Sequence, residues 1–130
     1  MIDHLDHIVL TTIDLEACKG FYIDVLGMRL ETFGEGRVAF VFGHQKINVH
    51  VRGHEFEPKA HLPVPGALDL CFIASCSLEQ VIERLEGHPW PILEGPVKRT
   101  GAAGPIRSVY VRDPDLNLVE ISEYLPAPSA

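Results

Sequence analysis

Apolar and polar residues alternate with period two along four stretches of the chain, a pattern typical of β-strands that bury one face. The stretches are residues 6–10, 46–51, 68–72 and 117–122. In each stretch one parity is aliphatic or aromatic, and the other parity carries a side chain able to bind a ligand. These side chains are His7, Asn48 or His50, Asp69, and Glu120. We therefore expect them on the polar faces of sheets, where they could converge in one concavity.

Two stretches have helical rather than strand periodicity. In the first, Asp14 can cap a helix whose apolar residues recur every three or four positions until Gly27 ends it. In the second, Ser77 and Gln80 form a capping-box pattern, and Gly87 ends the helix. The strands are expected at about residues 4–12, 28–33, 37–42, 46–51, 66–74, 91–97, 106–111 and 117–123.

The order of one strand, one helix and three strands thus occurs twice. Residues 1–52 form the first module, the proline-rich residues 53–65 a linker, residues 66–124 the second module and residues 125–130 a tail. Laying the modules over one another places His7 on Asp69 and Asn48 on Glu120. We expect one α+β domain in which two tandem βαβββ modules form a curved mixed sheet, a cup that neither half forms stably alone.

Composition narrows the class of protein. The chain has 130 residues and a formal charge of −7, with its 11 basic residues scattered, which argues against a nucleic-acid partner. Its three cysteines, an odd number, are typical of reduced core thiols rather than of a disulfide framework. No secretory leader or run of about 20 apolar residues is visible, so we expect no membrane association and a cytoplasmic location.

Three segments resemble one known family. They are residues 5–8 (LDHI), the end of the first helix at residues 21–28 (FYIDVLGM), and the turn at residues 113–115 (DPD) with the strand that follows it. These segments resemble the vicinal oxygen chelate superfamily, which includes glyoxalase I, bleomycin-resistance proteins and extradiol dioxygenases. Residues 46–50, 53–60 and 94–101 are most similar to the glyoxalase domain-containing protein 5 subgroup.

The resemblance implies a cup that holds a divalent metal, with His7 and Glu120 as ligands and usually a homodimer. Asp69 stands where the family commonly has histidine, which leaves Mg²⁺, Mn²⁺, Ni²⁺, Zn²⁺ and Fe²⁺ open. Pseudo-symmetry nominates Asn48 as the fourth ligand, but His50 is the better ligand type, so we expect His50 at the metal and Asn48 behind it. Two further side chains, expected to contact the substrate or support the ligands, are Arg99 and Tyr110.

The implied activity is a metal-dependent lyase or isomerase of glyoxalase type, in which Glu120 moves a proton on a small oxygen-chelating substrate. Thr11 stands where glyoxalase I commonly has an arginine for glutathione, which disfavours that conjugate as substrate. One alternative is an extradiol-type dioxygenase that holds iron through His7, His50 and Glu120. Another alternative is a non-catalytic, ligand-sequestering protein of the bleomycin-resistance kind.

Structural roles compete with these ligand roles. Asp69 could form a buried ion pair with Arg99 or Arg112, which would leave the cup without a metal. The turn before the last strand has Leu116 where glycine is common, so Asn117 is expected to take the left-handed conformation. The remaining histidines are expected to be solvated: His4, His44, His54, His61 and His88.

Overall fold

The structure, a computed structural model, describes residues 1–126 and divides into two compact units. Unit 1 comprises Met1–Leu68 and Pro114–Asn117, and unit 2 comprises Asp69–Asp113 and the chain from Leu118 onward. The strands are β1 (His7–Thr12), β2 (Arg29–Phe33), β3 (Arg37–Phe42), β4 (Gln45–Val51), β5 (Asp69–Ile73), β6 (Glu94–Gly101), β7 (Gly104–Arg112) and β8 (Leu118–Tyr124). The helices are α1 (Leu15–Lys19), the π-helix η1 (Gly20–Val25) and α2 (Leu78–Gly87).

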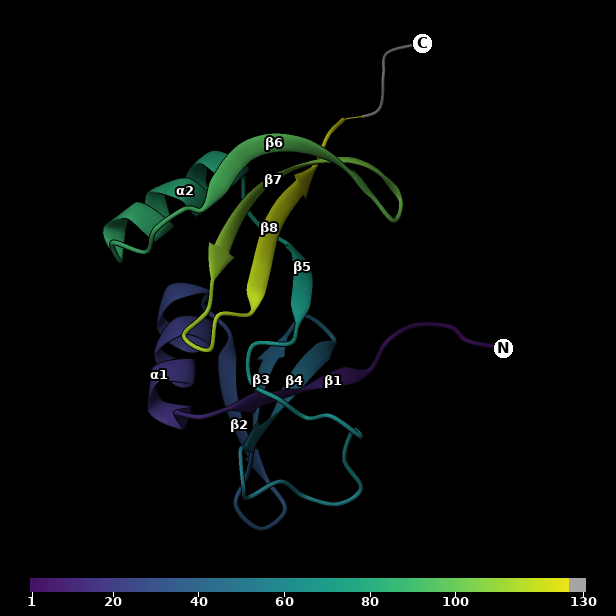
Figure 1. Ribbon diagram of the computed structural model, residues 1–130. Helices are drawn as coiled ribbons and strands as arrows, with labels where there is room; N and C mark the ends of the chain where they lie inside the picture. Colours follow the sequence, from purple (N-terminus) through teal and green to yellow (C-terminus); the bar gives the residue numbers. More distant parts are fainter. Residues whose placement is uncertain (127–130) are drawn as a thin grey trace. The chain divides into compact units, whose positions relative to one another are not determined.

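Each unit contains one mixed four-stranded sheet, and the two sheets have equivalent topology. The order is β1-β4-β3-β2 in unit 1 and β5-β8-β7-β6 in unit 2 (Figure 1). In both sheets the first and last strands of the module pair in parallel, and the other neighbours are antiparallel. This repetition confirms the predicted α+β class with two tandem βαβββ modules.

The core of unit 1 lies between its sheet and its helix. Tyr22 stacks on Phe40 with ring centroids 5.2 Å apart, and Phe21 meets Tyr22 edge-on at 4.8 Å. All three rings are fully buried, as are Leu10 and Ile47, which belong to the predicted apolar parity of their strands.

The helix of unit 1 begins and ends as expected but changes type along its length. The Asp14 side chain accepts a hydrogen bond from the backbone N–H of Ala17 at 3.1 Å, and Gly27 has a φ of +78°. Between these ends the α-helical turn from Leu15 to Lys19 widens into the π-helix η1. The residue pattern gave no sign of this widening.

In unit 2, helix α2 packs on one face of the sheet. Ser77 and Gln80 make the predicted capping box. The helix buries Leu78 and Leu85 near Val119 and Ile121 of β8, the apolar parity of that strand. No helix in the described range 1–126 is long and apolar enough to cross a membrane.

Four local expectations were wrong. Leu116, and not Asn117, takes the left-handed conformation, with a φ of +71°. Strand β6 begins at Glu94 rather than at residue 91, and it extends to Gly101, which pairs with Gly104, so the expected glycine-rich loop is a tight hairpin. Of the three cysteines only Cys18 is buried, because the two others lie on polar parity or at a helix entry: Cys71 and Cys76.

Candidate functional site

His7 and Asn48 lie on the same face of the unit 1 sheet. In the parallel pairing of β1 with β4, His7 is opposite Lys46 and Val9 is opposite Asn48. Asn48 is therefore one pleat further along the face than the partner of His7. Its side chain is 6% exposed, and its Oδ1 atom has no hydrogen-bond partner among residues 1–126. A buried carbonyl oxygen without a partner is costly, so this atom is poised for a cation or a donor.

The imidazole of His7 is held in a defined orientation. Its Nδ1 atom is 2.7 Å from the Asp6 carboxylate, and the side chain remains 43% exposed. This hydrogen bond lowers the pKa of the Asp6 carboxyl below its ordinary value of 3.8. A carboxylate on one ring nitrogen is the usual support of a metal-binding histidine, and it leaves Nε2 available to a ligand.

His50 lies on the same face but farther away. It is opposite Thr11, four residues along the sheet from His7, so about 13 Å separates their positions at the usual rise per residue. Side chains stand roughly perpendicular to a sheet, and two imidazoles at this separation do not reach one ion. The register therefore brings Asn48, and not His50, next to His7.

The surroundings of His50 combine the Phe56 ring with charges of both signs, from Arg37, Glu55 and Glu57. The residue is 3% exposed, and neither ring nitrogen finds a hydrogen-bond partner in the described chain. Burial, and then the positive charge of Arg37, lower the pKa of the imidazole below 6.5. His50 is thus neutral at pH 7, with one donor and one acceptor that are both unused.

Unit 2 repeats the offset of unit 1. In the parallel pairing of β5 with β8, Asp69 is opposite Leu118 and Cys71 is opposite Glu120. Glu120 is therefore one pleat beyond the partner of Asp69, as Asn48 is beyond the partner of His7. The superposition expected from the sequence agrees with this register.

Glu120 is anchored through one of its two carboxylate oxygens. The Ser108 hydroxyl donates to Oε2 of Glu120 at 2.6 Å, and the Ser122 hydroxyl lies 3.4 Å from the same oxygen. Ser108 and Ser122 also lie 2.6 Å apart, and Cys71 Sγ is 3.5 Å from Ser122 Oγ. Because these hydrogen bonds converge on Oε2, Oε1 of Glu120 is left for another partner.

Arg99 and Tyr110 lie on the polar face of unit 2, where Tyr110 is opposite Glu120 in the pairing of β7 with β8. Arg99 donates from Nε to the Tyr110 hydroxyl at 3.1 Å and from Nη2 to Glu94 at 3.2 Å. Its guanidinium also lies 5.5 Å from the Tyr110 ring centroid. Arg99 is thus paired with Glu94, and the proposed ion pair of Asp69 with Arg99 is not observed.

Each unit carries one pair of side chains with the chemistry of metal ligands. Within residues 1–126 no group of three or more His, Cys, Asp and Glu side chains is placed to hold an ion. The donors instead come as two matched pairs, His7 with Asn48 and Asp69 with Glu120. Amide and carboxylate oxygens, which these pairs supply, are the donors that hard divalent ions such as Mg²⁺ or Mn²⁺ prefer.

Several residues near the candidate groups were not anticipated. Ser108 was missed because a serine in a strand has no distinctive pattern. Its position next to Val109 did indicate that it faces the opposite side of the sheet from that valine. Arg37 was missed because it comes near His50 only through the pairing of β3 with β4. Phe56 was missed because its contact with His50 depends on the path of the linker, residues 53–65. A hollow of about 120 Å³ lies on the apolar face of β3 and β4 and includes none of the predicted ligands.

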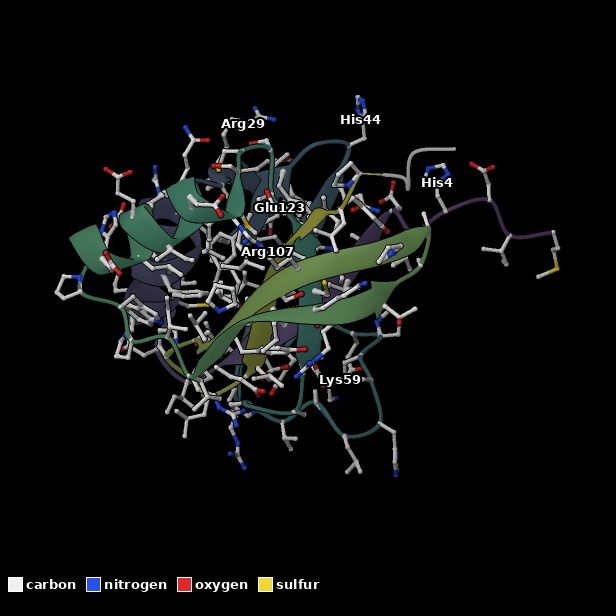
Figure 2. All side chains as sticks on the ribbon, turned by 90° about the horizontal axis from the view of Figure 1, so that it is seen from above. His4, Arg29, His44, Lys59, Arg107 and Glu123 are labelled. Atoms are coloured by element: carbon white, nitrogen blue, oxygen red, sulfur yellow. The ribbon has the colours of Figure 1, made fainter. Side chains whose placement is uncertain are left out.

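The side chains outside these groups have structural or solvent roles. His4 and His44 are exposed and project away from the ribbon, as expected (Figure 2). Arg107 and Glu123 lie together beside α2 in the same view, with Nη2 3.1 Å from Oε1, and Arg107 also pairs with Glu79. These ions tie the helix to β7 and β8 on the face opposite Glu120.

Comparison with known proteins agrees with the fold. Residues 4–121 match the Glyoxalase/Bleomycin resistance protein/Dioxygenase superfamily, and the chain belongs to this family. A virulence protein of Salmonella typhimurium is 50% identical over 96% of this chain and 87% of its own. A glyoxalase domain-containing protein of Mycosarcoma maydis is 53% identical over 95% of this chain and 69% of its own.

Solved structures extend the comparison. The crystal structure of the Salmonella virulence protein has a TM-score of 0.94, covering 96% of this chain and 99% of that one. A lactoylglutathione lyase from Agrobacterium tumefaciens has a TM-score of 0.73 at 25% identity, with 95% of both chains covered. A family of this kind hosts several reactions, so the chemistry depends on the residues of the site.

Proposed function

We propose that the protein is a divalent-metal-dependent lyase or isomerase of glyoxalase type that acts on a small substrate with adjacent oxygen atoms. The observation that carries the proposal is the matched offset of two donor pairs, His7 with Asn48 and Asp69 with Glu120. Two donors do not complete the sphere of a divalent ion, so the proposal takes both pairs as ligands. His50, expected earlier at the metal, is replaced by Asn48.

Each proposed ligand has a feature that suits its role. The Asp6 carboxylate holds the His7 ring so that Nε2 is the coordinating atom. The Oδ1 atom of Asn48 is buried without a partner, and a cation would satisfy it. Asp69 is exposed, and a carboxylate oxygen in place of a histidine favours Mg²⁺ or Mn²⁺ over softer metals.

Glu120 is the proposed proton carrier. Ser108 and Ser122 fix its Oε2 atom, so Oε1 can take a proton from a carbon next to a carbonyl and return it elsewhere. A bound divalent metal would supply Lewis-acid polarisation of that carbonyl, worth several kcal/mol. Because the serine hydroxyls hold Oε2 by hydrogen bonds, the carboxylate is positioned before substrate arrives.

Proton exchange at carbon gives a direct test. Small α-hydroxycarbonyl compounds are incubated in D₂O with Mn²⁺-loaded protein. The incubation is repeated with Mg²⁺-loaded protein, and exchange in this second sample is followed by NMR. We expect loss of the C–H signal with the wild type, and no loss with Glu120→Gln. Glu86→Gln, an exposed change on α2, is the matched control. Absence of exchange with every compound of the panel would argue for sequestration, as in bleomycin-resistance proteins.

The dioxygenase alternative is less favoured by the register. It requires His7 and His50 on one iron with a carboxylate, and about 13 Å along the sheet separates the two histidines. Oxygen consumption by Fe²⁺-loaded protein with a catechol is the measurement that would revive it.

The finer subgroup and the assembly are also proposals. Placement with the glyoxalase domain-containing protein 5 subgroup is proposed on residues 46–50, 53–60 and 94–101, and the name of the Mycosarcoma maydis relative says only that it is a glyoxalase domain-containing protein. A homodimer is proposed because both sheets have open edge strands, and Val9 on β1 and Ile73 on β5 are 43% and 49% exposed. Sedimentation at micromolar concentration tests this, and a monomer would contradict it.

A further inference from the structure

Three side chains of unit 1, Arg37, Phe33 and Phe56, form a cationic and aromatic group with His50. The Arg37 guanidinium carbon lies 5.0 Å from the centroid of the Phe33 ring and 4.9 Å from that of Phe56. The Phe56 ring in turn lies 5.7 Å from the His50 ring, edge-on. Register places Arg37 opposite Phe33, and the pairing of β3 with β4 carries Arg37 to the polar face that bears His50. This group is named the Arg37 cluster.

The hydrogen-bonding groups of the Arg37 cluster are unused. Within residues 1–126 the Arg37 guanidinium makes ring contacts but no ion pair or hydrogen bond, and ring contacts consume none of its N–H groups. Both nitrogens of His50 also lack partners at 3% exposure. Buried polar groups are normally satisfied, so the two ring nitrogens of His50, which lie beside the unpaired Arg37, require an explanation.

The neighbouring acids do not provide one. Glu55 accepts from the backbone N–H of Gly53 with both carboxylate oxygens, at 2.9 and 3.1 Å. Glu57 pairs with Lys59. Lys46 is a second cation, and its Nζ atom lies 3.9 Å from the centroid of the Phe33 ring. Both acids act on His50 by charge, but neither bonds to Arg37 or to the imidazole, so the N–H groups of Arg37 still lack an acceptor, which favours an anion as the missing partner.

We propose that Arg37 and His50 form a subsite for a carboxylate group of the substrate. The fork of Arg37 matches a planar carboxylate, and the His50 ring, whose nitrogens have no partner, adds one further donor. Phe33 and Phe56 exclude water around the pair, which strengthens the interaction. This inference rests on the proposed function for the identity of the anion as part of the substrate.

The spacing along β4 limits the size of that substrate. His50 follows Asn48 by two residues on the same face, which is about 7 Å at the usual rise per residue. A compound that placed its chelating oxygens at Asn48 and its carboxylate at His50 would carry the two groups only a few bonds apart. The subsite therefore selects short hydroxy- or oxo-acids over neutral compounds and over bulky conjugates.

Binding of a simple carboxylate to chelator-treated protein tests the subsite without any metal. Butanoate and its neutral isostere butanamide are titrated while the ring signals of His50 are followed by NMR. We expect saturable shifts with butanoate and none with butanamide, a comparison that needs no variant. Equal responses to both compounds, or no response to butanoate, would overturn the proposal.

Variants and a second anion locate the effect. Arg37→Met keeps the packed stem and should weaken butanoate binding at least tenfold, while Arg29→Met, an exposed arginine of the same sheet face, should leave it unchanged. Tighter binding of inorganic phosphate than of butanoate would overturn the choice of carboxylate. Arg37-dependent binding of butanoate by protein that binds no Mn²⁺ would leave the subsite standing and reject the proposed metal function.

Discussion

Replacing Asn48 by leucine should affect stability in opposite directions with and without metal. In metal-free protein the change removes a buried Oδ1 atom that has no partner, and such an atom costs about 1–3 kcal/mol. The larger side chain has room, because its neighbours across β3 and β1 are Ala39 and the 43% exposed Val9. After some overpacking we expect a net gain of about 1 kcal/mol in the free energy of unfolding.

With metal present the order should reverse. A site occupied at a free Mn²⁺ concentration of about 100 times its dissociation constant stabilises the wild type by about 2.7 kcal/mol. Leucine at position 48 cannot coordinate the ion, so this gain is lost in the variant. The free energy of unfolding of the wild type should then exceed that of the variant by about 1–2 kcal/mol. This difference is the stabilisation by the metal minus the stability that the variant gained by losing the unpaired Oδ1 atom.

Urea unfolding followed by circular dichroism, in chelator and in Mn²⁺, measures both differences. Asn48→Asp serves as the matched variant, because it keeps the size and an oxygen donor and should retain the gain from Mn²⁺. The reasoning fails if Asn48→Leu is the less stable protein in chelator, or if Mn²⁺ stabilises it as much as the wild type. Either result would mean that the Asn48 carbonyl is a structural group.

Three further predictions concern other parts of the molecule. If Glu120 is the proton carrier as proposed, Ser108→Ala should lower turnover about tenfold while Mn²⁺ affinity changes little, because it frees the Glu120 carboxylate without removing a ligand. Gly66→Ala should lower stability by roughly 1–3 kcal/mol in urea unfolding, since φ is +82° and a Cβ would lie 2.6 Å from the Asp115 carbonyl oxygen. Arg107 lowers the pKa of Glu79 below 4.5, so this pair stabilises above that pH and less as pH falls, and Glu79→Gln should flatten the acid limb of stability against pH.

The strand faces could be predicted because period-two alternation depends on local sequence alone. Val119 and Ile121 are buried and Glu120 faces the other way, as their parity indicated. The relation of His7 to Asn48 needed one more step, the register of β1 on β4. Laying one module over the other supplied that step, since it placed Asn48 on Glu120.

The choice between Asn48 and His50 shows where sequence reasoning stopped. Metal-ligand preference favours the imidazole of His50 over the amide of Asn48. The sequence of residues 46–51 does not indicate how far either side chain lies from His7. The answer depends on pairing between strands about 40 residues apart in the chain, which is a tertiary property. Arg37 was hidden for the same reason, because its approach to Phe56 depends on the path of an irregular linker.

The left-handed residue in the turn before β8 was misplaced for a more local reason. Asparagine tolerates positive φ better than leucine does, so propensity pointed to Asn117. In the structure, the Asn117 side chain instead accepts the backbone N–H of Leu68 at 2.8 Å, and Leu116 takes a φ of +71°. A hydrogen bond between distant segments therefore outweighed the local preference.

Titration of chelator-treated protein with Mn²⁺, by calorimetry at pH 7, tests the central claim most directly. The account predicts stoichiometric binding by the wild type and a loss of affinity of at least about tenfold in Glu120→Gln, which keeps the size of the side chain but removes the charge that binds the ion. Affinity should also fall below about pH 6, where protons compete with the ion for histidine ligands. A wild type that binds no Mn²⁺, or a Glu120→Gln variant that binds it unchanged, would contradict the proposed site.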